Sequence, residues 1–354
     1  MVRACVLMVA VLGAMAGAQE APEPVEREVV PASENAAIWY WQSWLEMAEP
    51  MMVVRTATYT KDGLDVSEDS SEEEVLRALR DASYAIDLLI HASKMEQCDF
   101  GSRPDHGLSE SRMFPHPHLR PSRAAANLLA VDAGRLFEEG ESERATERLA
   151  TIFRLSEHIS RDETLMPTLV GTAVFEVGAA YTERFQDKFS DEDQRTLAEA
   201  LGRYPTEDPL RLVASVRADA AASAKALTEQ IRSGQLDGSV LEGLGMDGVL
   251  ASVESEMGSV VGNTRAARLA RAKLVRDAMR IAELGEKFAG AWDDDASIDT
   301  LARDAASGEY GVFAPMIVGP YERLRTTDFQ SRAKLAALRA WANGETETLE
   351  LPGD

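Results

Sequence analysis

The spacing of apolar residues constrains the fold most strongly, because they recur every three or four positions over most of the chain. Between residues 71 and about 97, this spacing places Val75, Leu79, Ala82, Ile86, Leu89 and Ile90 on one helix face. Similar segments, separated by Gly and Pro, predict helices near 33–49, 121–139, 142–160, 163–188, 191–203, 209–232, 263–288 and 297–307, with a last helix ending near Ala342. Only residues 51–60 are β-prone, and aromatic residues make up only 6% of the chain. The sequence therefore predicts an all-α fold.

One stretch has the pattern of a helical hairpin. Ala133 and Ala145 are small enough to let two antiparallel helices approach closely, and Gly140 allows a tight turn between them. The packing positions of a tetratricopeptide repeat are matched by Leu129, Ala133, Leu136, Gly140, Ala145, Leu149 and Ile152. The chain contains one good copy, whereas stable arrays need three or more. We expect antiparallel helical hairpins packed as a tetratricopeptide-like or α-solenoid-like array.

The first residues have the pattern of a secretory signal. Arg3 precedes an apolar run over residues 4–15, and small residues at 16–18 offer a cleavage site. That run is too short to span a bilayer, and no other uncharged apolar stretch is long enough. We therefore expect an exported protein, periplasmic or otherwise in the cell envelope or extracellular, with no integral membrane span after cleavage. Cleavage removes Cys5 and leaves Cys98 as the one cysteine.

Composition and the positions of Gly- and Pro-rich segments predict the domain organisation. The 60 acidic residues against 37 basic ones disfavour sequence-independent binding to nucleic acid, and 45% hydrophobic residues argue against wholesale disorder. The predicted segments are a signal peptide (1–18), a flexible acidic and Pro-rich lead-in (19–32), a helical hairpin domain (33–232), a Gly-rich hinge (233–248), a C-terminal helical region (249–344) and a tail (345–354).

A candidate metal site lies in the loop over residues 98–119. Cys98, His106, His116 and His118 offer a thiolate and imidazoles, which are ligands that zinc prefers. Their spacing is irregular and matches no zinc signature. The alternative is a Pro-rich loop whose histidines bond to the backbone, and we assign no cofactor.

Glu176 is the one charged residue between Thr164 and Thr182. Its apolar surroundings predict a helix buried nearly all round, in which a carboxylate must be paired or protonated. It is a candidate catalytic acid with a raised pKa. The alternative, which we favour, is a structural ion pair with an arginine of a neighbouring helix, the candidates being Arg123, Arg135 and Arg154.

Trp39, Trp41 and Trp44 lie in a six-residue stretch of the first predicted helix. If exposed, they could stack on sugar rings or on a partner. Because Ile38 and Leu45 share the helix face of Trp41 and large aromatic residues dominate core packing, we favour burial.

The stretch from Cys98 to about Gly178 resembles an uncharacterised group of exported all-helical proteins of planctomycete-type bacteria. The resemblance rests on Cys98-Asp99-Phe100-Gly101, Pro117-His118-Leu119, Leu128-Leu129, Asp132-Ala133, Glu139-Gly140-Glu141, His158 and Leu169-Val170-Gly171. The group usually has Trp at the position of Phe100. The resemblance implies an exported helical architecture and no catalytic residue. It also implies that Cys98, Asp99 and His118 act together as a buried structural knot that closes the loop onto the helices.

The leading functional hypothesis is a non-enzymatic helical scaffold that binds a protein partner in the cell envelope. The first alternative is a metal- or acid-dependent hydrolase that uses the Cys98 and histidine loop or Glu176. The second alternative is glycan binding by the tryptophans of the first helix.

Overall fold

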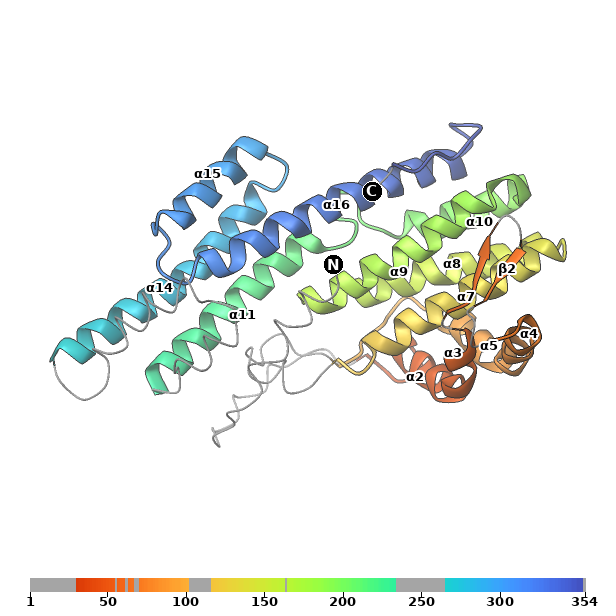
Figure 1. The fold of residues 1–354 in the computed structure, drawn as a ribbon, viewed down its shortest axis with the longest axis horizontal. Helices are drawn as coiled ribbons and strands as arrows, with labels where there is room; N and C mark the ends of the chain where they lie inside the picture. Colours follow the sequence, from red (N-terminus) through yellow and green to blue (C-terminus); the bar gives the residue numbers. More distant parts are fainter. Residues whose placement is uncertain are drawn as a thin grey trace. The chain divides into compact units, whose positions relative to one another are not determined.

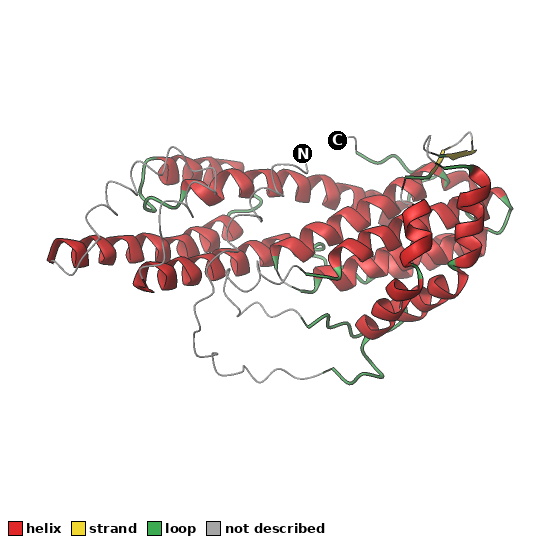
Figure 2. Cartoon of the chain, turned by 60° about the horizontal axis from the view of Figure 1, so that its bottom comes forward, coloured by secondary structure: helices red, strands yellow, loops and turns green. Residues whose placement is uncertain are grey.

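The structure is a computed structural model that describes residues 30–54, 56–60, 63–66, 70–101, 116–162, 164–233 and 265–352. The predicted signal peptide, most of the lead-in, all but the first residue of the hinge, and His106 lie outside these residues. The described chain is almost entirely helical (Figure 1; Figure 2), which confirms the all-α prediction.

The chain divides into two compact units. One comprises residues 27–102, 117–212 and 327–354, and we call it the α8 unit. The other comprises residues 1–26, 103–116 and 213–326, and we call it the α14 unit. In the part of the chain that the structure describes, no helix combines the length and the apolar character needed to cross a membrane.

The centre of the α8 unit is a bundle of neighbouring helices, α7 (Leu119–Glu138), α8 (Ser142–Ser160), α9 (Leu165–Arg184) and α10 (Asp191–Gly202). A short 3-10 helix, η1 (Gln186–Lys188), joins the last two. Gly140 turns the chain between α7 and α8 with a positive φ of 78°, as the hairpin pattern predicts. Ala133 and Ala145 are fully buried where the two helices meet, so the predicted hairpin is confirmed.

Helices α8 and α9 approach closely at Gly171. A Cβ atom at this position would lie 2.1 Å from the Ser160 Oγ and 3.0 Å from the backbone oxygen of Ser156. The Ser156 hydroxyl donates a hydrogen bond to the Gly171 carbonyl over 2.8 Å. The absence of a side chain at residue 171 therefore sets the distance between the two helices.

A second layer of the α8 unit contains α2 (Ala36–Glu46), α3 (Ala48–Val54), α4 (Glu72–Asp81) and α5 (Ser83–Ser93). Helix α2 packs on α5, and α5 packs on α8. A two-stranded antiparallel hairpin, β1 (Thr58–Thr60) and β2 (Gly63–Asp65), lies beside α7. Part of α16 (Pro315–Ala342) also belongs to this unit, because the division between the units falls within that helix.

The α14 unit contains α11 (Leu212–Ser233), apart from its first residue, α14 (Arg265–Gly290) and α15 (Asp295–Ala306), together with the beginning of α16. Gly285 of α14 faces Ala220 of α11 so closely that a Cβ atom there would lie 2.2 Å from the alanine Cβ. The Tyr321 hydroxyl bonds to a carboxylate oxygen of Asp219 over 3.2 Å. Close helix contacts of this kind define a small helical core.

Several local expectations are wrong. Residues 51–54, which the sequence marks as β-prone, belong to helix α3. Pro50 does not prevent this helix, because it occupies the first turn, where proline is tolerated. The single helix expected over 71–97 is two helices, separated at Ala82, whose ψ of −1° departs from helical geometry. The first helix, expected near 33–49, begins at Ala36, and Asn35 caps it by accepting a hydrogen bond from the Ala37 N–H. These differences shift element boundaries and leave the fold class unchanged.

Candidate functional site

A buried polar cluster centred on Glu157 ties the end of α8 to α5. The Glu157 carboxylate receives hydrogen bonds from Arg154 at 2.9 Å and from Arg161 at 2.5 Å. Arg154 also donates to the backbone oxygens of Ser93 and Met95, each over 3.1 Å, at the end of α5. One guanidinium thus neutralises a buried carboxylate and satisfies two carbonyl groups, one at the last residue of α5 and one just beyond that helix.

His158 lies in the same cluster and has both ring nitrogens occupied. Its Nδ1 contacts the Tyr40 hydroxyl at 3.0 Å, and its Nε2 contacts a guanidinium nitrogen of Arg154 at 3.1 Å. Burial, reinforced by the charge of Arg154, holds the pKa of His158 well below its usual range. Burial likewise raises the pKa of Tyr40. His158 is therefore a neutral structural group and a poor metal ligand.

The loop that follows α5 is closed by Asn35 and Phe100. The Asn35 side chain accepts from the Asp99 N–H at 2.9 Å and donates to the Asp99 carbonyl at 3.0 Å. The ring of Phe100 stacks on His118, with centroids 4.4 Å apart and planes at 3°. The predicted knot of Cys98, Asp99 and His118 stays a prediction. Asn35 and Phe100 were not among its predicted members. The only sequence signal for Asn35 is that it is a polar residue directly before the first helix.

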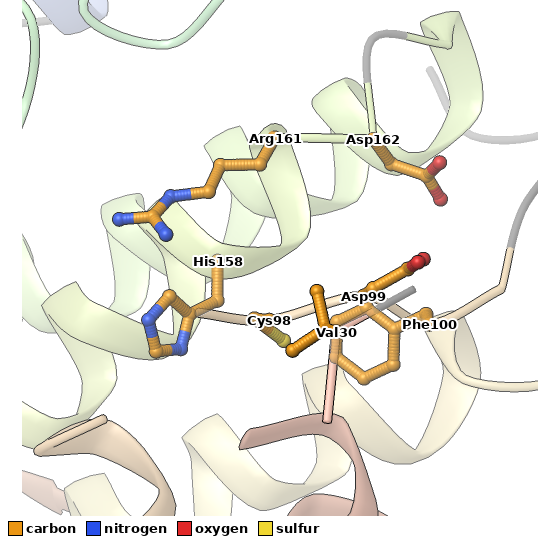
Figure 3. Close-up of a pocket in the computed structure, with 7 residues that line it drawn as sticks. All are labelled: Val30, Cys98, Asp99, Phe100, His158, Arg161 and Asp162. Carbon is orange, nitrogen blue, oxygen red and sulfur yellow. The ribbon is translucent and has the colours of Figure 1, made fainter. Parts of the chain in front are cut away.

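A pocket of about 200 Å³ opens beside this loop. Its walls include Cys98, Asp99, Arg161 and Asp162, together with Val30, Phe100 and His158. Figure 3 shows the two aspartate carboxylates on one side of the pocket, and the imidazole and guanidinium on the other. Burial raises the pKa of the Cys98 thiol. The cysteine therefore contributes a protonated, weakly nucleophilic group to the wall.

His116, His118 and Asp162 come together at the start of α7 and the end of α8. The three potential ligand atoms all lie within 4.8 Å of one another. The His118 Nε2 lies 3.7 Å from the Asp162 carboxylate, and these side chains are only 2% and 7% exposed. Burial lowers the pKa of His116. The sequence pattern pointed to both histidines but not to Asp162, which is 44 positions from His118 and joins no recognisable motif.

The other two candidate metal ligands are not part of this group. Cys98 lies on the pocket wall and is not one of the three grouped residues. His106 lies outside the described residues. Among the described residues, two of the four predicted ligands, His116 and His118, are grouped with Asp162, and the set of one cysteine and three histidines stays a prediction.

Glu176 forms a structural ion pair, but with a lysine and not with an arginine. The Lys334 ammonium lies 2.8 Å from one carboxylate oxygen, and the Ser331 hydroxyl donates to the other at 2.7 Å. The Glu176 side chain is 33% exposed, so the expectation of a carboxylate buried on all sides is wrong. Arg135 and Arg154, which we considered as partners, pair with Asp132 and Glu157.

The three tryptophans of α2 have different environments. Trp44 is buried and contacts Trp41 edge to face, with centroids 4.9 Å apart. Trp39 and Trp41 are half-buried, and Trp39 packs against His91. The expected burial of the helix face that carries Trp41 is wrong: Ile38 and Leu45 on that face are 43% and 78% exposed.

No known protein family matches this chain, and searches among curated proteins and solved structures find no similar protein.

Proposed function

We propose that this protein is an exported helical scaffold that binds a protein partner of the cell envelope through the outward face of α2. The exported location rests on the signal-like pattern of residues 1–18. The resemblance to an exported helical group agrees with it and stays a prediction.

The observation that carries the proposal is the apolar character of both faces of α2. One face, which includes Tyr40, Ser43 and Trp44, is buried against the unit. The opposite face presents Ile38 and Leu45 to solvent, with Trp41 half-buried between them. A surface helix ordinarily has a polar outward face. An apolar outward face that includes a tryptophan has the composition of a protein-binding surface.

Neighbouring residues extend this surface onto α5. Tyr84 is 55% exposed, and its hydroxyl lies 3.5 Å from the Gln42 amide nitrogen, at the weak limit of a hydrogen bond. A tyrosine and an amide beside an apolar centre provide polar groups that a partner can bond at the rim of the interface. We define the α2 surface as Ile38, Trp41, Gln42, Leu45 and Tyr84.

The ion pairs favour the scaffold over an acid-dependent hydrolase. Glu176 is bonded to Lys334 and Ser331, and Glu157 is bonded to two arginines. Both carboxylates already accept hydrogen bonds from side chains of their own fold, which leaves them poorly placed to exchange a proton with a substrate. The bonding of these carboxylates is that of groups that hold helices together.

Site-specific photo-crosslinking in cells tests the proposal. A benzoyl-phenylalanine at Leu45 is expected to form a discrete adduct with one envelope protein, and Ile38→Glu in the same chain is expected to abolish it. Leu269 of α14 is a matched control, because it is an apolar residue with 63% exposure elsewhere in the chain. Equal labelling from Leu45 and Leu269, or an adduct that survives Ile38→Glu, would contradict the proposal.

The half-buried Trp39 and Trp41 keep glycan binding as a second candidate. It predicts that envelope polysaccharide changes tryptophan fluorescence and that Trp41→Ala removes the change. Such a change without a protein adduct would replace the scaffold with a glycan-binding function.

A further inference from the structure

We propose that His116, His118 and Asp162 form a binding site for a divalent transition-metal ion of the zinc type. The site is separate from the α2 surface and does not depend on the scaffold function.

The spacing of the side chains carries this inference. The 3.7 Å between the His118 Nε2 and the Asp162 carboxylate exceeds the length of a normal hydrogen bond. Two ligands bound tetrahedrally to one zinc ion at about 2.0–2.1 Å lie roughly 3.3–3.4 Å apart. A movement of a few tenths of an ångström would therefore bring both atoms to a common ion. The ring nitrogen of His116 completes a group whose members all lie within 4.8 Å.

The fold holds the ligands in place before an ion binds. His118 is the residue at which α7 begins, and its ring lies flat on Phe100. Asp162 directly follows Arg161, the residue that ends α8. Only Pro117 separates His116 from His118, so the chain itself keeps the two imidazoles close. A site built on the ends of two packed helices loses little conformational entropy when it binds an ion.

The ligand set indicates the class of ion. Two imidazoles and one carboxylate suit zinc and similar transition metals, whereas calcium and magnesium prefer oxygen ligands. Neutral imidazoles with one carboxylate give a site with one negative charge, which favours a dication. Three protein ligands also leave a coordination position for water or a small anion.

The pocket beside the site provides room for that additional ligand. Asp162 is part of the pocket wall, and the volume of about 200 Å³ is large enough for several waters. Asp99 also lines this pocket, on the same side as Asp162 (Figure 3). The neighbouring His158 is excluded as a ligand, because both of its ring nitrogens are bonded.

Titration of the metal-free full chain with Zn²⁺ tests the proposal. The wild type is expected to bind one equivalent, and Asp162→Asn and His116→Gln are each expected to weaken binding by at least about 10-fold. His91→Gln is the matched control, because His91 lies on the exposed side of α5 and outside the cluster. Its Zn²⁺ affinity is expected to equal that of the wild type.

Three site variants, Asp162→Asn, His116→Gln and His118→Gln, keep the test decisive if one of them misfolds. His118→Gln removes a buried ring from its stack on Phe100, so its helical circular dichroism must be checked first. His116 is half-buried and lies outside the helices, so its replacement leaves the core intact. Wild-type affinity in both His116→Gln and Asp162→Asn, or the absence of binding to the wild type at micromolar Zn²⁺, would overturn the proposal.

Replacement of Zn²⁺ by Co²⁺ identifies the ligands. Tetrahedral coordination by nitrogen and oxygen is expected to give visible absorption bands without a thiolate charge-transfer band in the near ultraviolet. An intense thiolate band that disappears in Cys98→Ser would overturn the ligand set and assign the ion to the cysteine.

Discussion

Glu157, in the last turn of α8, and Asp162, just beyond the end of that helix, show two different environments for a carboxylate. Glu157 is bonded to two arginines, one of which also bonds the carbonyl of Ser93, the last residue of α5. Five residues later, Asp162 lies on a pocket wall with an imidazole at 3.7 Å, a distance that suits a shared ion better than a hydrogen bond. Carboxylates so close in sequence thus differ in role because one faces arginines and the other faces histidines and a pocket.

The largest expected effect comes from Arg154→Met. This change leaves Glu157 with one cation in a buried position and removes the hydrogen bonds to the end of α5. Removal of one partner of a buried ion pair costs about 3–5 kcal/mol of unfolding free energy. Urea denaturation followed by circular dichroism measures the loss.

Arg144→Met is the matched control for this prediction. Arg144 pairs with Glu141 on the same helix, but its side chain is 54% exposed, so a loss below about 1 kcal/mol is expected. If the two variants cost the same, the Glu157 cluster is not a structural centre and its contrast with Asp162 disappears.

A pH effect of intermediate size is expected from His158. Because its pKa is lowered in the folded protein, the unfolded chain takes up a proton first as the pH falls below about 6.5. Stability should therefore decrease on acidification, by up to about 1.4 kcal/mol per pH unit from this group. Above pH 7 both states are neutral, and the group makes no pH-dependent contribution.

The difference in unfolding free energy between the wild type and His158→Gln, measured from pH 7.5 to 5, isolates this effect. The lowered pKa of His116 acts in the same direction but is present in both proteins and cancels. A difference that stays constant over this range would show that His158 is accessible to protons, and would place it functionally with the pocket and not with the Glu157 cluster.

The smallest effect is expected from Glu176→Gln. The glutamine can still accept the Ser331 hydrogen bond, and the lost ion pair with Lys334 is partly solvated. A loss of about 0.5–1 kcal/mol is expected, as for other partly exposed pairs. Lys334→Met, whose side chain is 10% exposed in the native pair, should cost more because it leaves the carboxylate without its cation. The opposite order would show that Glu176 is not held by this pair.

Local features of the sequence predicted the helices because their causes are local. The Ser71 hydroxyl and Glu74 carboxylate form the capping box that starts α4, and both partners lie within four positions. Gly140 turns the chain between α7 and α8 because glycine accepts a positive φ without steric cost. Apolar spacing then determined which segments are helical, since one helical turn relates residues three or four positions apart.

Tertiary packing decided the rest. Spacing alone cannot choose which apolar face of α2 turns inward, and the structure buries Tyr40 and Trp44 while it exposes Leu45. The partner of Glu176 is 158 positions away, and Asp162 meets His118 only because α7 and α8 pack together. The sequence by itself determined the all-α class, the approximate positions of the helices and the hairpin turn, which depend on neighbouring residues. The candidate sites depend on the packing of distant helices, and only the folded chain brings their residues together.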